Sequence, residues 1–292
     1  MSHMKANLLM LIASLIWGTA FVSQKTGMGA IGPFTFSFAR FFLASLTVLP
    51  LVLIYESNNF SKIVKNKNYI LLSLLAGLAL FGGMGIQQYA LLKSQIANTA
   101  FLSTLYVPFV ALISRFIFRS HLHWIVWIAV LLCLYGSYLL SSNQAFDIQK
   151  SDSLLFIAAF FFAIHIIIID IFMKKFYSPF TFGFIQYMIV FFLSMILAFS
   201  LEMPTLTNIK IEWFEIIYTG VFSAGIGYTL QIIAQSKASP APAAIILSME
   251  SVFGAIAAWI LINQSLDINK IIGCLAIFIG VIIVQLLQNK NT

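Results

Sequence analysis

Charged residues are scarce in this chain. Only 9% of its 292 residues are Asp, Glu, Lys or Arg, whereas roughly a quarter of the residues of a soluble globular protein are charged. Apolar residues make up 61% of the sequence. These proportions exclude an ordinary soluble protein and indicate a chain whose solvent is mostly lipid.

Cysteine and the usual catalytic motifs are also nearly missing. The two cysteines, Cys133 and Cys274, both lie inside apolar runs, so we expect no disulfide framework. The sequence contains no GxxxxGK[ST] phosphate loop, HExxH, CxxC or nucleophile elbow, and its four histidines form no metal-binding pattern. We therefore predict no cofactor, no metal site and no nucleotide hydrolysis of the phosphate-loop type.

What the chain has instead is long apolar runs. A bilayer core about 30 Å thick requires about 20 apolar residues per helix. The first run follows Lys5 and could be mistaken for a signal peptide, but nine further runs follow it, so we interpret it as the first span. The ten predicted spans are 6–24, 34–55, 69–92, 96–116, 123–141, 152–173, 179–200, 214–235, 241–263 and 269–288.

The chain also repeats itself. The segment PFTFSFARFF (33–42) returns 146 residues later as PFTFGFIQYM (179–188). Five spans fall in each copy, and because five is odd the second copy must enter the membrane from the opposite side. We therefore predict an all-α integral membrane protein with ten transmembrane helices arranged as two inverted five-helix repeats, 5–142 and 152–288.

The loop charges predict the orientation. The net charge of +7 would suggest nucleic acid in a soluble protein, but here we predict no nucleic-acid partner. Ten cations flank the spans on the side of the N-terminus: Lys5, Lys62, Lys65, Lys67, Arg115, Arg119, Lys174, Lys175, Lys237 and Lys290. Five lie on the other side: Lys25, Lys93, Lys150, Lys210 and Lys270. This bias predicts that both termini are cytoplasmic.

Glu250 is the polar residue whose position inside a predicted span is the most costly. It lies near the middle of the ninth span, where an acidic side chain costs on the order of 3 kcal/mol on insertion scales. Its helical neighbours Ala243, Gly254 and Ala257 are small, so this face is expected to point into the bundle. Glu250 is a candidate contact for a substrate amine or a proton-coupling site. The alternative is a protonated or hydrogen-bonded glutamate that joins helices.

His165 lies in the middle of the sixth span. It could hydrogen-bond a substrate, carry a proton, or simply pack in the core. Asp170 lies about 140° around the helix from it, so the two are not expected to face one cavity. Asp170 is instead expected to pair with Lys174 four residues later.

Arg40 lies about 10 Å into the second span, counted at 1.5 Å per residue from Pro33. It could attract an anion, snorkel towards water or pair with an acid on a neighbouring helix, and we favour the pairing. The repeat places Gln186 at the equivalent position.

Polar side chains also recur at helical spacing in symmetry-related spans. In the eighth span Ser223, Gly227, Gln231 and Gln235 follow each other at intervals of four. Such stripes line a cavity or form interhelical hydrogen bonds. Further candidates for a cavity wall are Gln88 in the third span, Tyr106 in the fourth and Trp17 in the first.

These features resemble the drug/metabolite transporter superfamily, in particular its EamA-type members with two five-helix repeats. The family commonly has Glu-Pro in the ninth span, whereas here Ser251 follows Glu250 and removes the usual cause of a helix break; Pro108 keeps the proline of the first copy. The stretches that carry the resemblance are IWGTAF (16–21), FARFFLA (38–44), NTAFLSTLYVPFVALI (98–113), FFFAIHIIIIDIFMKK (160–175) and SPAPAAIILSMESVFGAIAAW (239–259).

The resemblance implies a secondary transporter in the bacterial inner (plasma) membrane, with a cavity lined mainly by spans 1, 3, 4, 6, 8 and 9. We predict a carrier that exports or exchanges a small amino-acid-like metabolite by alternating access, driven by a substrate or proton gradient. Glu250 and His165 are also candidates for proton coupling. The predicted substrate-binding residues are Glu250, His165, Gln88, Tyr106, Gln231 and Trp17.

Three alternatives stay open. An importer of a nucleotide-type metabolite such as S-adenosylmethionine would demand a larger and more polar pocket. A membrane-embedded enzyme would have only Glu250 and His165 as a candidate catalytic pair. A passive channel would show flux without saturation, although the sequence contains no ring of like charges and no carbonyl filter motif.

Overall fold

The ten predicted spans are present in the computed structural model, which describes residues 1–57, 65–94, 96–141, 150–263 and 265–290. The described part contains helices and no strand. Lys62 and the connection 142–149 lie outside the described residues. Ten helical segments are long and apolar enough to cross a membrane, with ends within a few residues of the predicted ones. The chain is an all-α, multi-pass membrane protein.

Some spans are single helices and others consist of several pieces. The first five spans are α1 (His3–Thr26), α2 (Pro33–Leu51) continued by η1 (Val52–Glu56), α4 (Lys67–Leu91), α5 (Ile96–Ser103) with α6 (Tyr106–Phe116), and α7 (Trp124–Ser141). The other five are α8 (Lys150–Lys175), α9 (Pro179–Leu201), α11 (Trp213–Ile217) with η3 (Tyr218–Gly227) and α12 (Tyr228–Gln235), α13 (Pro240–Leu247) with α14 (Met249–Ile262), and α15 (Ile268–Lys290). The short helix α10 (Leu206–Ile211) lies in a connection.

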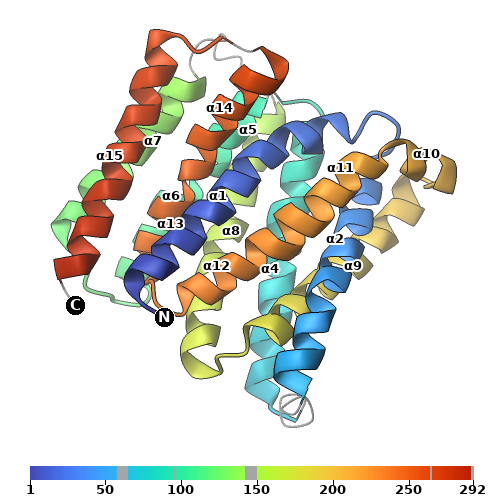
Figure 1. Cartoon of the computed structure of the whole chain (residues 1–292), viewed down its shortest axis with the longest axis horizontal. Helices are drawn as coiled ribbons and strands as arrows, with labels where there is room; N and C mark the ends of the chain where they lie inside the picture. The colour runs from blue at the N-terminus through green and yellow to red at the C-terminus, as the bar shows by residue number, and fades with distance from the viewer. Residues whose placement is uncertain (58–64, 95, 142–149, 264, 291–292) are drawn as a thin grey trace.

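The helices pack mostly against partners that are distant in sequence. Helix α7 lies along α15 on one side of the molecule, and α2 lies along α9 on the opposite side (Figure 1). Between these pairs α1 packs on α14 and α4 packs on α8. The described beginning of α1 and the described end of α15 lie at the same end of the bundle (Figure 1).

The fourth span breaks near its middle. Helix α5 ends at Ser103 and α6 begins at Tyr106. Pro108 has no N–H with which to bond the carbonyl four residues before it. The Thr104 carbonyl instead accepts a hydrogen bond from the Val107 N–H at 2.9 Å. Proline therefore accounts for the break in the first copy.

The ninth span breaks in the same way although it has no proline at this point. Helix α13 ends at Leu247 and α14 begins at Met249. The Ser248 hydroxyl donates to the Ile245 carbonyl at 2.6 Å, and the Ser251 N–H bonds to the Ser248 carbonyl at 3.1 Å. A serine that bonds back to its own helix can bend it, so the break survives the loss of the family's usual proline.

The two broken spans contact each other close to their breaks. The hydroxyl oxygens of Thr104 and Ser251 lie 2.8 Å apart and form a buried hydrogen bond. This bond joins the fourth span directly to the ninth.

The beginning of α2 is capped by an acid from α9's end. The carboxylate of Glu202 accepts hydrogen bonds from the backbone N–H groups of Phe34 at 2.9 Å and Thr35 at 2.7 Å. Negative charge is favourable at a helix N-terminus, where these N–H groups have no partner within the helix. A Cβ at Gly32 would overlap this carboxyl group, so glycine lets the acid approach.

The beginning of α9 is capped in the same way from the end of η1, which continues α2. The carboxylate of Glu56 accepts from the N–H groups of Phe180 at 3.1 Å and Thr181 at 2.7 Å. The Ser178 hydroxyl also donates to it at 2.6 Å. Glu56 and Glu202 are separated by 146 residues, which is the spacing of the sequence repeat.

The buried apolar side chains of the described residues form four clusters, and two of them meet at the centre of the fold. One contains residues of α1, α6, α7, α8, α13, α14 and α15. The other contains residues of α2, α4, α9, η3 and α12. Trp17 and Phe162 pack against both clusters, so the space beside them lies at the centre of the fold.

Candidate substrate cavity

A cavity of about 50 Å³ lies where the two clusters meet. Its walls come from α1, α4, α6, α8, η3, α12, α13 and α14, which belong to spans 1, 3, 4, 6, 8 and 9. The space between the helices of a bundle is a common place for small-molecule sites. The cavity thus has the place of a small-molecule site.

Five of the six predicted site residues line this cavity. They come from five different helices and from both halves of the sequence: Trp17, Tyr106, His165, Gln231 and Glu250. Their role in substrate binding stays a prediction, but the fold places them around one space.

Gln88 does not line the cavity. Its amide nitrogen donates to the Gln24 carbonyl at 3.1 Å and lies 3.0 Å from the Met28 sulfur, so it holds α4 against α1. The neighbouring Gln87 lines the cavity instead and donates to the Ser103 hydroxyl at 2.7 Å. A substrate role for Gln88 stays a prediction that the geometry does not favour.

Glu250 lies at the first turn of α14 and is 7% exposed. The Tyr106 hydroxyl lies beside its carboxyl group. A carboxyl group and a hydroxyl from two broken spans therefore face the cavity next to each other.

His165 faces the same cavity from α8 and is 1% exposed. Its Nε2 lies 2.6 Å from the Oε1 of Gln186 on α9. Because an amide oxygen only accepts hydrogen bonds, this ring nitrogen carries the proton. The Tyr228 ring packs edge-on against the imidazole with a centroid distance of 5.9 Å.

Trp17 is held in place by the π-helical turns of η3. Its Nε1 donates to the Ser223 carbonyl at 3.0 Å, and its ring lies 4.7 Å from the Tyr228 ring between centroids. A Cβ at Gly227 would lie 2.6 Å from the Trp17 Nε1. Glycine at this position therefore leaves room for the indole. π-Helical turns are frequent at functional sites because they open the helix wall.

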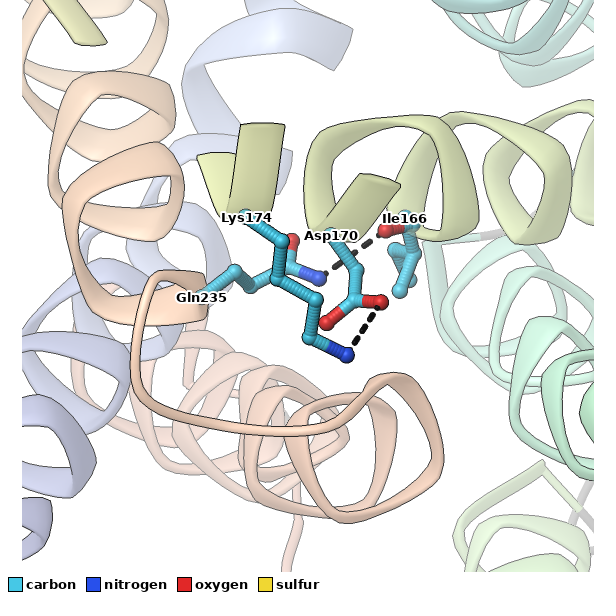
Figure 2. Close-up of polar contacts among 4 residues, drawn as sticks. All are labelled: Ile166, Asp170, Lys174 and Gln235. Atoms are coloured by element: carbon cyan, nitrogen blue, oxygen red, sulfur yellow. Dashed lines mark hydrogen bonds and ion pairs between the residues drawn. The ribbon is translucent and has the colours of Figure 1, made fainter. Parts of the chain in front are cut away.

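The polar stripe of the eighth span divides between two roles. Ser223 and Gln231 line the cavity. Gln235 accepts from the Gln231 amide at 3.0 Å, and it donates to the Ile166 carbonyl of α8 at 3.0 Å (Figure 2). Gln235 therefore fixes Gln231 and joins α12 to α8.

The pairing of Asp170 and Lys174 is confirmed. The Lys174 Nζ lies 2.9 Å from the Asp170 Oδ2, four residues apart on α8 (Figure 2). Asp170 is not among the described residues that line the cavity, as its angle around the helix predicted.

Arg40 differs from its expectation. It is 0% exposed, so it does not snorkel, and its three guanidinium nitrogens reach no hydrogen-bond partner among the described residues. The guanidinium carbon lies 5.0 Å from the Phe41 ring centroid and 5.8 Å from that of Phe36. Aromatic faces are its neighbours, in place of the acid that we expected.

Metal and disulfide chemistry find little support in the described residues. No group of three or more His, Cys, Asp or Glu side chains there could hold a metal ion. Cys133 and Cys274 are both free.

Comparison with known proteins agrees with the fold. The model of the EamA-like transporter family matches the chain twice, over residues 4–142 and 149–286. An uncharacterized transporter of Archaeoglobus fulgidus is 28% identical over 284 residues, covering 96% of this chain and 86% of that protein. The uncharacterized transporter YoaV of Bacillus subtilis is 24% identical over 277 residues, covering 92% of each chain.

A solved structure shows the same fold. One crystal structure superposes with a TM-score of 0.81 over 99% of both chains, at 18% sequence identity. At that identity the likeness concerns the fold alone. The two family matches together span nearly the whole sequence, and the chain belongs to the EamA-like transporter family.

Proposed function

We propose that this transporter exports or exchanges small metabolites, amino acids or related compounds above all, across the inner membrane by secondary-active alternating access. One observation carries the proposal. Five polar and aromatic side chains that the sequence marked as unusual in a bilayer surround a single buried cavity. Intramembrane ionisable and polar groups commonly mark the path of a substrate.

The transport cycle would use the two halves of the chain, 5–142 and 152–288, as inverted repeats that rock around the cavity. The paired caps of Glu56 and Glu202, one repeat length apart, support this symmetry. The broken spans α5–α6 and α13–α14 supply two interrupted helices at equivalent positions, as expected for a midplane site. The excess of loop cations on the side of the N-terminus supports cytoplasmic termini.

Coupling to protons would use Glu250, with His165 as a second titrating group. A single buried carboxylate can be neutralised by a proton or by a substrate ammonium, and binding of one displaces the other. Such competition produces exchange of protons for substrate without any further machinery. The position of Glu250 in the cavity wall supports a carboxyl group that is available to either.

Flux into vesicles tests the proposal. The purified full-length protein is reconstituted in lipid vesicles, and uptake of a panel of labelled amino acids, their derivatives and nucleosides is measured with and without a pH gradient. We expect saturable flux that Glu250→Gln abolishes. Glu215→Gln is the matched control, because Glu215 lies on α11 and is not among the described residues that line the cavity. Flux no greater than that of empty vesicles for the whole panel would defeat the proposal.

The enzyme alternative is tested in the same preparation. Glu250 and His165 line one cavity, so a catalytic pair is geometrically conceivable. A reaction would form product in detergent, where no gradient exists, whereas a carrier leaves its substrate unchanged.

A further inference from the structure

The charge of the cavity wall carries information about the substrate. Among the described residues that line the cavity, Glu250 is the only acidic one, and none is a lysine or an arginine. The other polar groups are amides, hydroxyls and the imidazole of His165. The wall thus offers one carboxylate and no lysine or arginine in its described part.

A substrate carboxylate would find no lysine or arginine to pair with in the described wall. The Nε2 of His165 is already occupied by Gln186 at 2.6 Å. Arg40 is fully buried against aromatic rings and is not part of the described cavity wall. A free carboxylate placed in this space would be desolvated without a cation to pair with, which is strongly unfavourable.

The rest of the wall is rich in aromatic rings. Five of the lining residues are aromatic: Trp17, Phe21, Tyr106, Phe162 and Tyr228. Two of them are fixed by hydrogen bonds, because the Trp17 indole donates to Ser223 at 3.0 Å and the Tyr228 hydroxyl contacts the Met84 sulfur at 2.8 Å. Rigid rings around a carboxylate form a surface that attracts a cation by its charge and by the quadrupoles of the rings.

We propose that the cavity binds organic monocations: a primary or quaternary ammonium group next to Glu250, with an apolar body against the aromatic rings. Zwitterions with a free carboxylate are poor ligands. The inference rests on the proposed function, since it concerns the same site, and it narrows the substrates to amines and to amino-acid derivatives whose carboxylate is lost or blocked.

A matched set of probes tests the inference without any mutation. We compare 2-phenylethylamine, phenylalaninamide, phenylalanine and 2-phenylethanol by thermal shift and calorimetry on the detergent-purified full-length protein. Ligands that bind the folded state raise its Tm by mass action, and at equal concentration the tighter ligand raises it more. We expect the amine and the amide to bind at least about tenfold more tightly than phenylalanine or the alcohol, which corresponds to about 1.4 kcal/mol or more.

Two results overturn the inference. One is that phenylalanine binds as tightly as phenylalaninamide. If Arg40→Gln then abolished the binding of phenylalanine, Arg40 would be identified as the counter-ion. The other is failure of every cationic probe to bind. Vesicle flux separates this inference from the proposed function: zwitterions that move while cations do not defeat only the inference, and a panel in which nothing moves defeats the proposed function.

Substitutions separate the contribution of the Glu250 charge to ligand affinity from that of the aromatic rings. We expect Glu250→Gln to weaken the amine at least about tenfold and to leave 2-phenylethanol unchanged, whereas Glu250→Asp keeps the preference for cations. Tetramethylammonium has no N–H group, so its affinity depends on the charge and the aromatic rings and not on hydrogen bonds. We expect Trp17→Leu to lower the affinity for tetramethylammonium more than the affinity for 2-phenylethanol. Trp213→Leu is the control, because Trp213 is 60% exposed on α11. Amine affinity unchanged by Glu250→Gln in a folded variant also overturns the inference.

Discussion

Glu56 and Glu202 form a reciprocal pair of helix caps. Glu56, at the end of η1, accepts two backbone hydrogen bonds from the first turn of α9, and Glu202, after the end of α9, accepts two from the first turn of α2. The two helices lie side by side and run in opposite directions (Figure 1). Each acid therefore holds the beginning of one helix against the end of the other. The pair fastens α2 and α9 together at both ends.

The caps predict a loss of stability when their charge is removed. Glu56→Gln and Glu202→Gln keep one acceptor oxygen each but lose the negative charge that favours the helix N-terminus. We expect each substitution to lower the free energy of unfolding by about 1 kcal/mol, in the range found for helix N-caps. Thermal unfolding in detergent measures this.

The two caps are distant from each other, so their effects should add in the double variant. Glu215→Gln, an acid of α11 whose side chain has no part in either cap, is the control. Unchanged melting of both single variants would show that the caps contribute nothing to stability.

The close contact between Gly227 and the Trp17 indole predicts that a methyl group at position 227 is destabilising. In Gly227→Ala the new Cβ would lie 2.6 Å from Trp17 Nε1, so the indole must leave the Ser223 carbonyl. We expect weaker ligand binding and a loss of about 1 to 3 kcal/mol of stability, as is usual for overpacking. Gly85→Ala is the matched control on α4, because its Cβ would meet no atom closer than 3.8 Å. Ligand-induced thermal shifts compare the two, and equal effects would contradict the prediction.

Gln87 and Gln88 are adjacent but should respond differently to substitution. Gln88→Ala removes the hydrogen bond to the Gln24 carbonyl and should cost about 1 kcal/mol of stability with little change in affinity. Gln87→Ala alters the cavity wall and should change affinity more than stability. Melting temperature and ligand affinity are measured on both variants, and each variant is the control for the other. The reverse pattern would place Gln88 at the substrate.

The bond between the two broken spans predicts an energetic coupling. Thr104→Val, Ser251→Ala and the double variant form a cycle that isolates the 2.8 Å contact between their hydroxyls. Interhelical hydrogen bonds in membranes contribute about 0.6 kcal/mol on average and rarely more than about 1.7 kcal/mol. We expect a coupling energy in that range from unfolding measurements, and a value of zero would mean that the contact is not maintained.

The sequence predicted the large features because hydropathy and repetition are one-dimensional signals. The run lengths located the spans within a few residues, and the isolated polarity of Glu250 and His165 identified two members of the cavity wall. Asp170 and Lys174 were predictable since residues four apart meet on a helix.

Details of rotation and of contact between distant residues were not predictable. Gln88 and Gln87 differ by about 100° around one helix, and Gln87, in place of the predicted Gln88, is among the described residues that line the cavity. The two lie three and four residues after Met84, and both spacings place residues on one helix face, so the sequence did not distinguish them. The caps escaped notice because Glu56 and Glu202 stand at span ends, where charged residues are ordinary, and their partners lie more than a hundred residues away.

Arg40 has a consequence for how the protein is made. During synthesis α2 enters the bilayer long before α9 and η3, the helices that pack against it, have left the ribosome. Until they arrive, the guanidinium must stay hydrated or be shielded by another factor, because the lipid chains contain no group that replaces its hydrogen bonds to water. The first half of the chain is therefore an incomplete intermediate that waits for the second. The two halves, produced as separate polypeptides, should accumulate only when they are synthesised together.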